Sequence, residues 1–124
     1  MTRVIFLGVI ILSISFFELP AQHVQKMNAI LKLIASGSDA EINTFLLENL
    51  DETQLKNLAK VEAEIISLRK DFSQHEVMNE DVDRSKVSYV IESVRTRQPK
   101  EIIIKIKNNK IDALEIKDFI KNNN

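Results

Sequence analysis

The chain has 124 residues, and its 17 Lys and Arg against 18 Asp and Glu give a net charge of −1. A charge this close to zero argues against nucleic-acid binding, which needs a basic face to neutralise phosphates. The sequence contains no cysteine, which excludes a disulfide-stapled module, so a domain of this size must be held together by its hydrophobic core.

The N-terminal segment has the layout of a secretory signal peptide. A short basic region ends at Arg3, residues 4–17 are almost continuously apolar, and Pro20 and Ala21 supply a breaker and a small residue. This run is shorter than the roughly 18 to 20 apolar residues that a membrane-spanning helix needs, although an uncleaved anchor is the alternative. We expect a signal peptide over residues 1–21, cut after Ala21 or Gln22, and one domain over residues 22–124. The mature protein would be periplasmic or secreted and not bound to the membrane.

Three amphipathic helices are predicted next, because apolar residues recur there at steps of three and four. The first covers residues 23–36, and Gly37 is expected to end it in a left-handed conformation. Ser38 and Glu41 fit a capping box, which opens a second helix that runs to about Asn49. Asp51 opens the third and longest helix, residues 51–72. Its apolar stripe consists of Leu55, Leu58, Val61, Ile65, Leu68 and Phe72.

After residue 72 the pattern changes to period two, which indicates strands. Residues 73–84 are polar, and we expect an acidic connector there with at most a short strand at Val77 and Met78. Strands are predicted over residues 86–95, 101–107 and 111–116, with a turn at Gln98-Pro99-Lys100 and a hairpin at Asn108-Asn109-Lys110. Residues 118–124 are predicted to form a short helical end or a frayed tail.

This order predicts an α+β fold: an N-terminal signal helix, three helices, and a three- or four-stranded antiparallel β-meander packed on the long helix. Short turns force neighbouring strands to pair antiparallel. The helices would cover one face of the sheet. The other face, with Glu101, Lys105 and Lys107, would lie in water.

No catalytic, cofactor-binding or metal site is predicted. His23 lies beside the cleavage site and is expected to be mobile, and His75 is expected in a solvated loop, without the partners that an acid or base needs. Zinc would need three or four convergent ligands. His75, Glu76, Glu80 and Asp81 could supply some of them, but no H-x-x-x-H or Cys pair fixes their geometry.

A calcium-loop pattern begins after residue 78 but is incomplete. Asn79, Asp81, Asp83 and Ser85 occupy its positions 1, 3, 5 and 7. Arg84 then stands where the loop needs Gly, and Val90 stands where it needs a bidentate Glu. We therefore interpret this stretch as part of the acidic connector.

An enzyme remains the alternative to a binding domain. Tyr89, Glu92 and Asp83 could line a polar cavity in a small cone-shaped isomerase or hydrolase-accessory domain. Alternation along the strand directs Tyr89 and Glu92 to opposite sheet faces, however, so they converge only if a bulge intervenes. This placement of Tyr89 and Glu92 on opposite faces favours a domain without catalytic function.

The chain resembles small accessory domains of exported bacterial hydrolases, of the cystatin-like and nuclear transport factor 2-like α+β group. Ser73 stands where such domains commonly carry a Gly after the Phe of the long helix, and the Q-x-V-x-G loop of cystatin-type inhibitors is absent. The resemblance covers most of residues 24–117. It rests on Ala29-Ile30-Leu31-Lys32-Leu33-Ile34-Ala35-Ser36-Gly37-Ser38-Asp39, Ile42-Asn43-Thr44-Phe45-Leu46, Leu68-Arg69-Lys70-Asp71-Phe72 and Lys110-Ile111-Asp112-Ala113-Leu114-Glu115-Ile116.

This resemblance implies a non-catalytic domain that binds or positions something. The hydrolase that usually accompanies such a domain is missing from this chain. The expected partner is therefore an envelope protein, or a second copy in a homo-oligomer.

Overall fold

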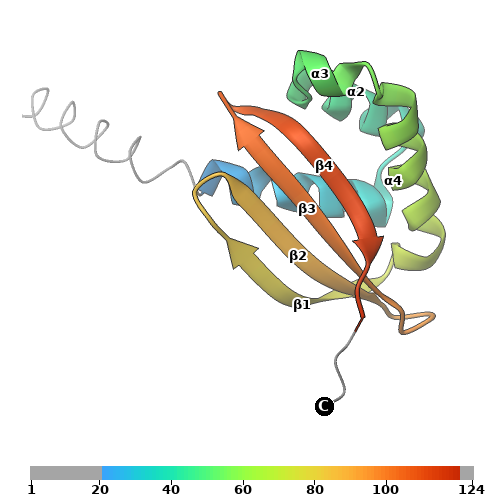
Figure 1. The fold of residues 1–124 in the computed structure, drawn as a ribbon. Helices are drawn as coiled ribbons and strands as arrows, with labels where there is room; N and C mark the ends of the chain where they lie inside the picture. Colours follow the sequence, from blue (N-terminus) through green and yellow to red (C-terminus); the bar gives the residue numbers. More distant parts are fainter. Residues whose placement is uncertain (1–20, 121–124) are drawn as a thin grey trace, which may run out of the picture.

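The computed structural model describes residues 21–120, in which helices come first and a sheet follows (Figure 1). The predicted signal peptide lies outside the described residues, apart from Ala21 at its end. In chain order the elements are a helix over residues 21–36, α2 (Asp39–Asn49), α3 (Glu52–Leu55), α4 (Leu58–Phe72), β1 (His75–Val82), β2 (Lys86–Ser93), β3 (Pro99–Lys107) and β4 (Lys110–Asp118).

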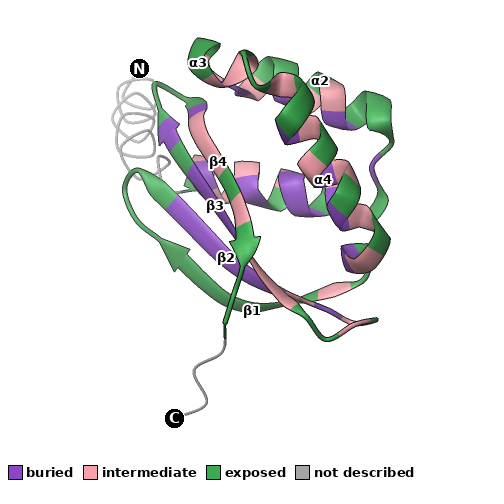
Figure 2. Cartoon of the chain, turned by 45° about the vertical axis from the view of Figure 1, so that its right-hand side comes forward, coloured by how far each residue is buried: buried purple, intermediate pink, exposed green. Residues whose placement is uncertain are grey.

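The four strands form one sheet in the order β1-β2-β3-β4, and each neighbouring pair is antiparallel. The predicted α+β meander is therefore confirmed. Figure 1 and Figure 2 show the helices together on one face of this sheet, which we call the inner face. Within residues 21–120, no helix is long and apolar enough to cross a membrane.

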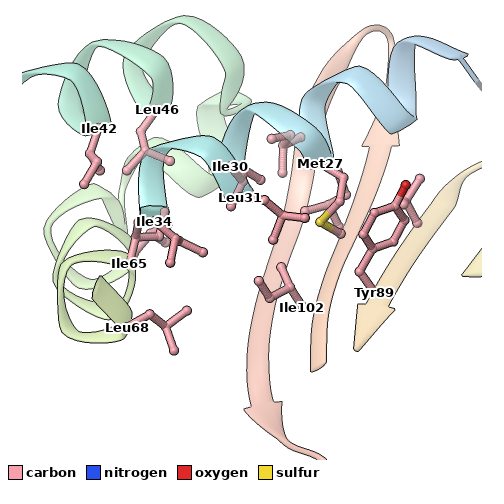
Figure 3. Close-up of a cluster of buried hydrophobic side chains, with 14 of the residues drawn as sticks. Met27, Ile30, Leu31, Ile34, Ile42, Leu46, Ile65, Leu68, Tyr89 and Ile102 are labelled. Atoms are coloured by element: carbon pink, nitrogen blue, oxygen red, sulfur yellow. The ribbon is translucent and has the colours of Figure 1, made fainter. Parts of the chain in front are cut away.

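The core lies between the inner face of β2 and β3 and the helices (Figure 3). Alternate residues of β2 and β3 enter it because successive side chains of a strand point to opposite faces. The helices contribute residues at steps of three and four, as their sequences predict. Its most deeply buried members include Met27, Ile30, Ile34, Ile42, Leu46, Ile65, Tyr89, Ile91, Ile102 and Ile104.

The long helix predicted over residues 51–72 is broken in two. The Asp51 side chain accepts a hydrogen bond from the Gln54 amide at 2.9 Å and so caps α3. The Asn57 amide then donates to the Gln54 carbonyl at 2.9 Å, which forms a tight turn between α3 and α4. This break allows α3 to lie against β4 while α4 packs on α2 and β2. Leu55 and Leu58 both still touch the core, so the apolar stripe is continuous although the helix is not.

Gly37 does not adopt the left-handed conformation that we predicted, because no described glycine has a positive φ. Its amide donates to the Leu33 carbonyl at 2.8 Å, and a Cβ at this position would lie 2.8 Å from the Leu33 Cα. Glycine is therefore required at position 37 because the Leu33 main chain lies too close to leave room for a side chain. The capping box that follows is confirmed: the Ser38 hydroxyl accepts from the Glu41 amide, and the Glu41 carboxylate accepts from the Ser38 amide, each at 3.1 Å.

The turn predicted at Gln98-Pro99-Lys100 is wrong in position. The turn between β2 and β3 precedes Pro99 and places Arg97 at a φ of 60°, whereas Pro99 itself begins β3. At the C-terminus, Asp118 still belongs to β4 and residues 119 and 120 form no helix, so of the two predicted alternatives the helical end is wrong for the described residues. Residues 121–124 lie outside the described part. The hairpin between β3 and β4 is confirmed, with Asn108 and Asn109 at φ of 52° and 61°, as a two-residue primed turn requires.

The outer face of the sheet is less exposed to solvent than predicted. Ser88, Val90 and Ile103 belong to this face, yet all three are buried. Glu101 is half-buried among them. Its carboxylate accepts a hydrogen bond from the Ser88 hydroxyl and lies 3.6 Å from the Lys117 ammonium. Lys105 is exposed, as expected.

Candidate functional site

His23 is a buried residue of the first helix, with 4% of its surface exposed, so the prediction that it is mobile is wrong. The main chain of Asp83 hydrogen-bonds its ring, while Nδ1 has no hydrogen-bond partner among the described residues. Burial lowers the pKa of His23 below the ordinary 6.5, and repulsion by Lys26 lowers it further; the Asp83 hydrogen bond offsets part of this. The hydrogen bond of the ring joins the first helix to the turn after β1, and the lowered pKa favours the neutral ring at neutral pH.

His75 lies at the start of β1 and is half-buried, so it is not the solvated loop residue that we predicted. Its Nδ1 is 2.7 Å from the main-chain carbonyl oxygen of Phe72, at the end of α4. A donor at this place satisfies a carbonyl that the helix leaves without an internal partner. The contact assigns His75 a structural role.

The three residues considered for a polar cavity are not brought together. The register of β2 with β3 is regular, so alternation directs Tyr89 inward and Glu92 outward. Asp83 is exposed at the turn after β1. The carboxylate that faces Tyr89 is instead Glu80, its partner across the β1–β2 ladder. Burial raises the pKa of the Tyr89 hydroxyl, and the negative charge of Glu80 raises it further.

The incomplete calcium-loop pattern does not form a loop. Asn79 and Asp81 lie within β1, where an extended backbone cannot fold around an ion as the calcium loop does. Among residues 21–120, no group of three or more His, Asp or Glu side chains could hold a metal ion.

The strand β1 is eight residues long, and it replaces the acidic connector that we predicted. It is an edge strand: β2 pairs with one side, and no strand of the described residues pairs with the other. All but its first residue are exposed, as Figure 2 shows along its length. We call this free edge, with the side chains of residues 75–82, the β1 surface. Its unpaired amides and carbonyls are available to another extended chain.

The β1 surface has a mixed inner face and a polar outer face. Val77 and Val82 lie opposite Ile91 and Val87 and therefore share the inner face, but each remains 41% exposed. Glu80, opposite Tyr89, lies on the same face between them. Glu76 and Asp81 lie opposite Glu92 and Ser88 and share the outer face. A bulge at Met78, which is 48% exposed, separates the two halves of the strand. Sequence alternation alone does not reveal these faces, because the extra residue at the bulge shifts the parity.

Apart from the β1 surface, a concavity lies between the first helix and α2. It has a volume of about 470 Å³, and the half-buried side chains of Leu33 and Phe45 form its apolar floor. Lys32, Glu41 and Glu48 also line it. The groove could accept an apolar side chain, but nothing in it specifies one ligand.

Comparisons with protein-family models, with curated proteins and with solved structures find no match to this chain.

Proposed function

We propose that this chain is an exported, non-catalytic interaction domain that binds another polypeptide along the β1 surface. One observation carries the proposal: Val77 and Val82 lie on either side of Glu80 on the inner face of an edge strand whose free side no described strand pairs, and the helices leave both valines exposed. A polypeptide that pairs with β1 would bury these side chains and satisfy the free main-chain groups in one step. The layout of residues 1–21 supports export.

The enzyme alternative receives less support from the geometry. Tyr89 and Glu92 point to opposite faces of the sheet, and Tyr89 is only 2% exposed. General acid–base catalysis needs ionisable groups within hydrogen-bond reach of the same substrate atom. The resemblance to accessory domains of exported hydrolases also favours binding.

Site-specific photo-crosslinking in the native host tests the binding surface. A photoreactive amino acid is introduced at Met78 on β1 and, as a matched control, at Leu47, an exposed apolar residue of α2 (52% exposed). We expect a discrete crosslinked product from position 78 that position 47 does not give. Products from both positions alike, or none from position 78, would refute the β1 surface as the binding site.

The same samples test export. The intact mass of the protein recovered from the host should lack residues 1–21, or 1–22 with the alternative cut. A soluble cytoplasmic protein that retains residues 1–20 would contradict export without affecting the crosslinking result.

A further inference from the structure

We propose that two copies of this chain associate through the free side of β4, so that their sheets join into one antiparallel sheet. β4 is the second edge strand, and Figure 1 shows it at the opposite edge from β1. Among residues 21–120, only an isolated bridge from Leu50 to Ile111 covers its free side, where the Asp51 amide donates to the Ile111 carbonyl at 3.0 Å. Residues 114–118, which we call the β4 edge, are therefore available to a second strand.

The main-chain groups of the β4 edge that point away from β3 follow from one hydrogen bond. The Phe119 amide donates to the Pro99 carbonyl at 3.4 Å. Hydrogen-bonded and non-hydrogen-bonded pairs alternate along an antiparallel ladder. Leu114, Ile116 and Asp118 are therefore in non-hydrogen-bonded pairs with β3, and their amides and carbonyls point outward.

One antiparallel register of two β4 edges is self-complementary. With Ile116 of each copy opposite Ile116 of the other, Glu115 of each copy lies opposite Lys117 of the other, as a two-fold axis requires. Opposite charges in this position stabilise strand pairing. The same register places Leu114 opposite Asp118, so every residue that directs its main-chain groups outward meets another that does the same.

The other registers centred on the β4 edge are unfavourable. Pairing centred on Glu115, on Lys117 or on Asp118 would set like charges directly opposite each other, which destabilises a sheet. Pairing centred on Leu114 would bring the second strand to Ile111, where Leu50 already lies. The charges and the bridge thus select the register centred on Ile116.

The outer face of the β4 edge gains an ion pair from each copy. Glu115 is exposed, and no other described residue forms an ion pair with it. Lys117 is also exposed, and its ammonium lies 3.6 Å from the Glu101 carboxylate across the β3–β4 ladder. In the dimer, Lys117 would lie between two carboxylates, Glu101 of its own chain and Glu115 of the other copy.

The inner face of the β4 edge has room for the second Ile116. This residue borders a concavity of about 460 Å³ between α4 and the edge of the sheet. The small, exposed residues of α4 that line it are Ala63 and Ser67. The side chain of Asp118 does not need to enter this concavity when it lies opposite Leu114, because it is exposed and its carboxylate is held by the Lys100 ammonium at 2.6 Å.

This dimer goes beyond the proposed function and does not depend on it. Two four-stranded sheets joined through β4 would carry one β1 strand at each outer edge. Both β1 surfaces would remain free to bind another polypeptide.

Sedimentation velocity at increasing concentrations of the protein, in the form that its native host produces, tests the association. We expect a monomer at low concentration and a dimer at high concentration. Glu115→Lys would set two Lys side chains opposite each other in both charge pairs, and Lys117→Glu would set two Glu side chains there. Each variant should raise the dissociation constant of the dimer about tenfold or more.

Mixing the two variants provides a rescue. In a mixed dimer, each charge pair again joins a Lys and a Glu, so an equimolar mixture of Glu115→Lys and Lys117→Glu should associate within about threefold of the wild type. A variant that had lost its fold would not be rescued in this way. Asp81→Lys is the matched control, because it makes the same charge change at an exposed residue of the opposite edge. It should change the dissociation constant less than about twofold.

Four results would overturn the inference. These are a wild-type protein that stays monomeric at every concentration, a dimer that neither β4 variant weakens, a mixture that fails to associate although the wild type does, and a dimer that Asp81→Lys abolishes. The crosslink expected at Met78 is measured separately, so the proposed function and the dimer can each fail alone.

Discussion

Replacing Gly37 by alanine would place a methyl group where the chain has no room for one. The added Cβ would lie 2.8 Å from the Cα, the carbonyl oxygen and the Cδ2 of Leu33. Two of these three atoms belong to the main chain, so a change of the Leu33 rotamer would relieve only part of the clash. Overpacking of this kind costs about 1 to 3 kcal/mol.

A second effect opposes this loss. Alanine restricts the unfolded chain more than glycine does, which stabilises the folded state by about 0.4 to 1 kcal/mol. The net expectation for Gly37→Ala is therefore a loss of about 1 to 2 kcal/mol in the free energy of unfolding. Urea denaturation followed by far-ultraviolet circular dichroism measures it, and Ser36→Ala, an exposed neighbour, should remain within about 0.5 kcal/mol of the wild type.

Asparagine at the same position separates close approach from the left-handed cap that the sequence suggests. Asn tolerates positive φ well, so it would be the better substitute in a left-handed cap. It is also larger than alanine, so it should be the worse substitute beside Leu33. A Gly37→Asn variant more stable than Gly37→Ala, or a Gly37→Ala variant as stable as the wild type, would refute the close-approach account.

Two further predictions concern stability. Phe72→Ala removes a side chain that is 3% exposed and should lower the free energy of unfolding by about 3 to 5 kcal/mol. The control Leu47→Ala should lower it by about 0.5 kcal/mol or less. A loss below about 1 kcal/mol for Phe72→Ala would mean that the apolar stripe of the helix does not face the core. Because burial and Lys26 lower the pKa of His23 in the folded state, the unfolded chain binds its proton first as the pH falls through 6.5. The free energy of unfolding should therefore decrease from about pH 7 to pH 5, and His23→Gln should reduce that slope; an unchanged slope would contradict a neutral, buried ring held by Asp83.

The elements that local chemistry determines could be predicted from the sequence. Ser38 and Glu41 satisfy each other's amides within one turn of chain, and Asn108 and Asn109 tolerate the positive φ of a tight hairpin. The helix break at Asn57 could not be predicted, because Leu55 and Leu58 keep the apolar spacing on both sides of it. Arg97 likewise carries no sequence signal for its positive φ.

The candidate site was missed for a related reason. Strand β1 buries almost no side chain, so its sequence lacks the apolar alternation that identifies strands, and its backbone pairing with β2 supports it instead. The bulge at Met78 further hides the shared face of Val77 and Val82. His23 was misplaced because its burial depends on the turn at Asp83, 60 positions away in the sequence, a contact that no local pattern encodes.

The C-terminal end of α2 has a consequence for how this protein folds. The last turn of α2 contains no basic residue, and cations that favour a helix C-terminus must come from elsewhere. The Lys26 ammonium donates to the Asn49 side chain at 2.7 Å from 23 residues away, and the Lys110 ammonium donates to the Glu48 carbonyl from 62 residues away. Contacts over such separations form slowly because a long loop must close first. We therefore expect α2 to complete its last turn late in folding, only after the β3–β4 hairpin has docked against it.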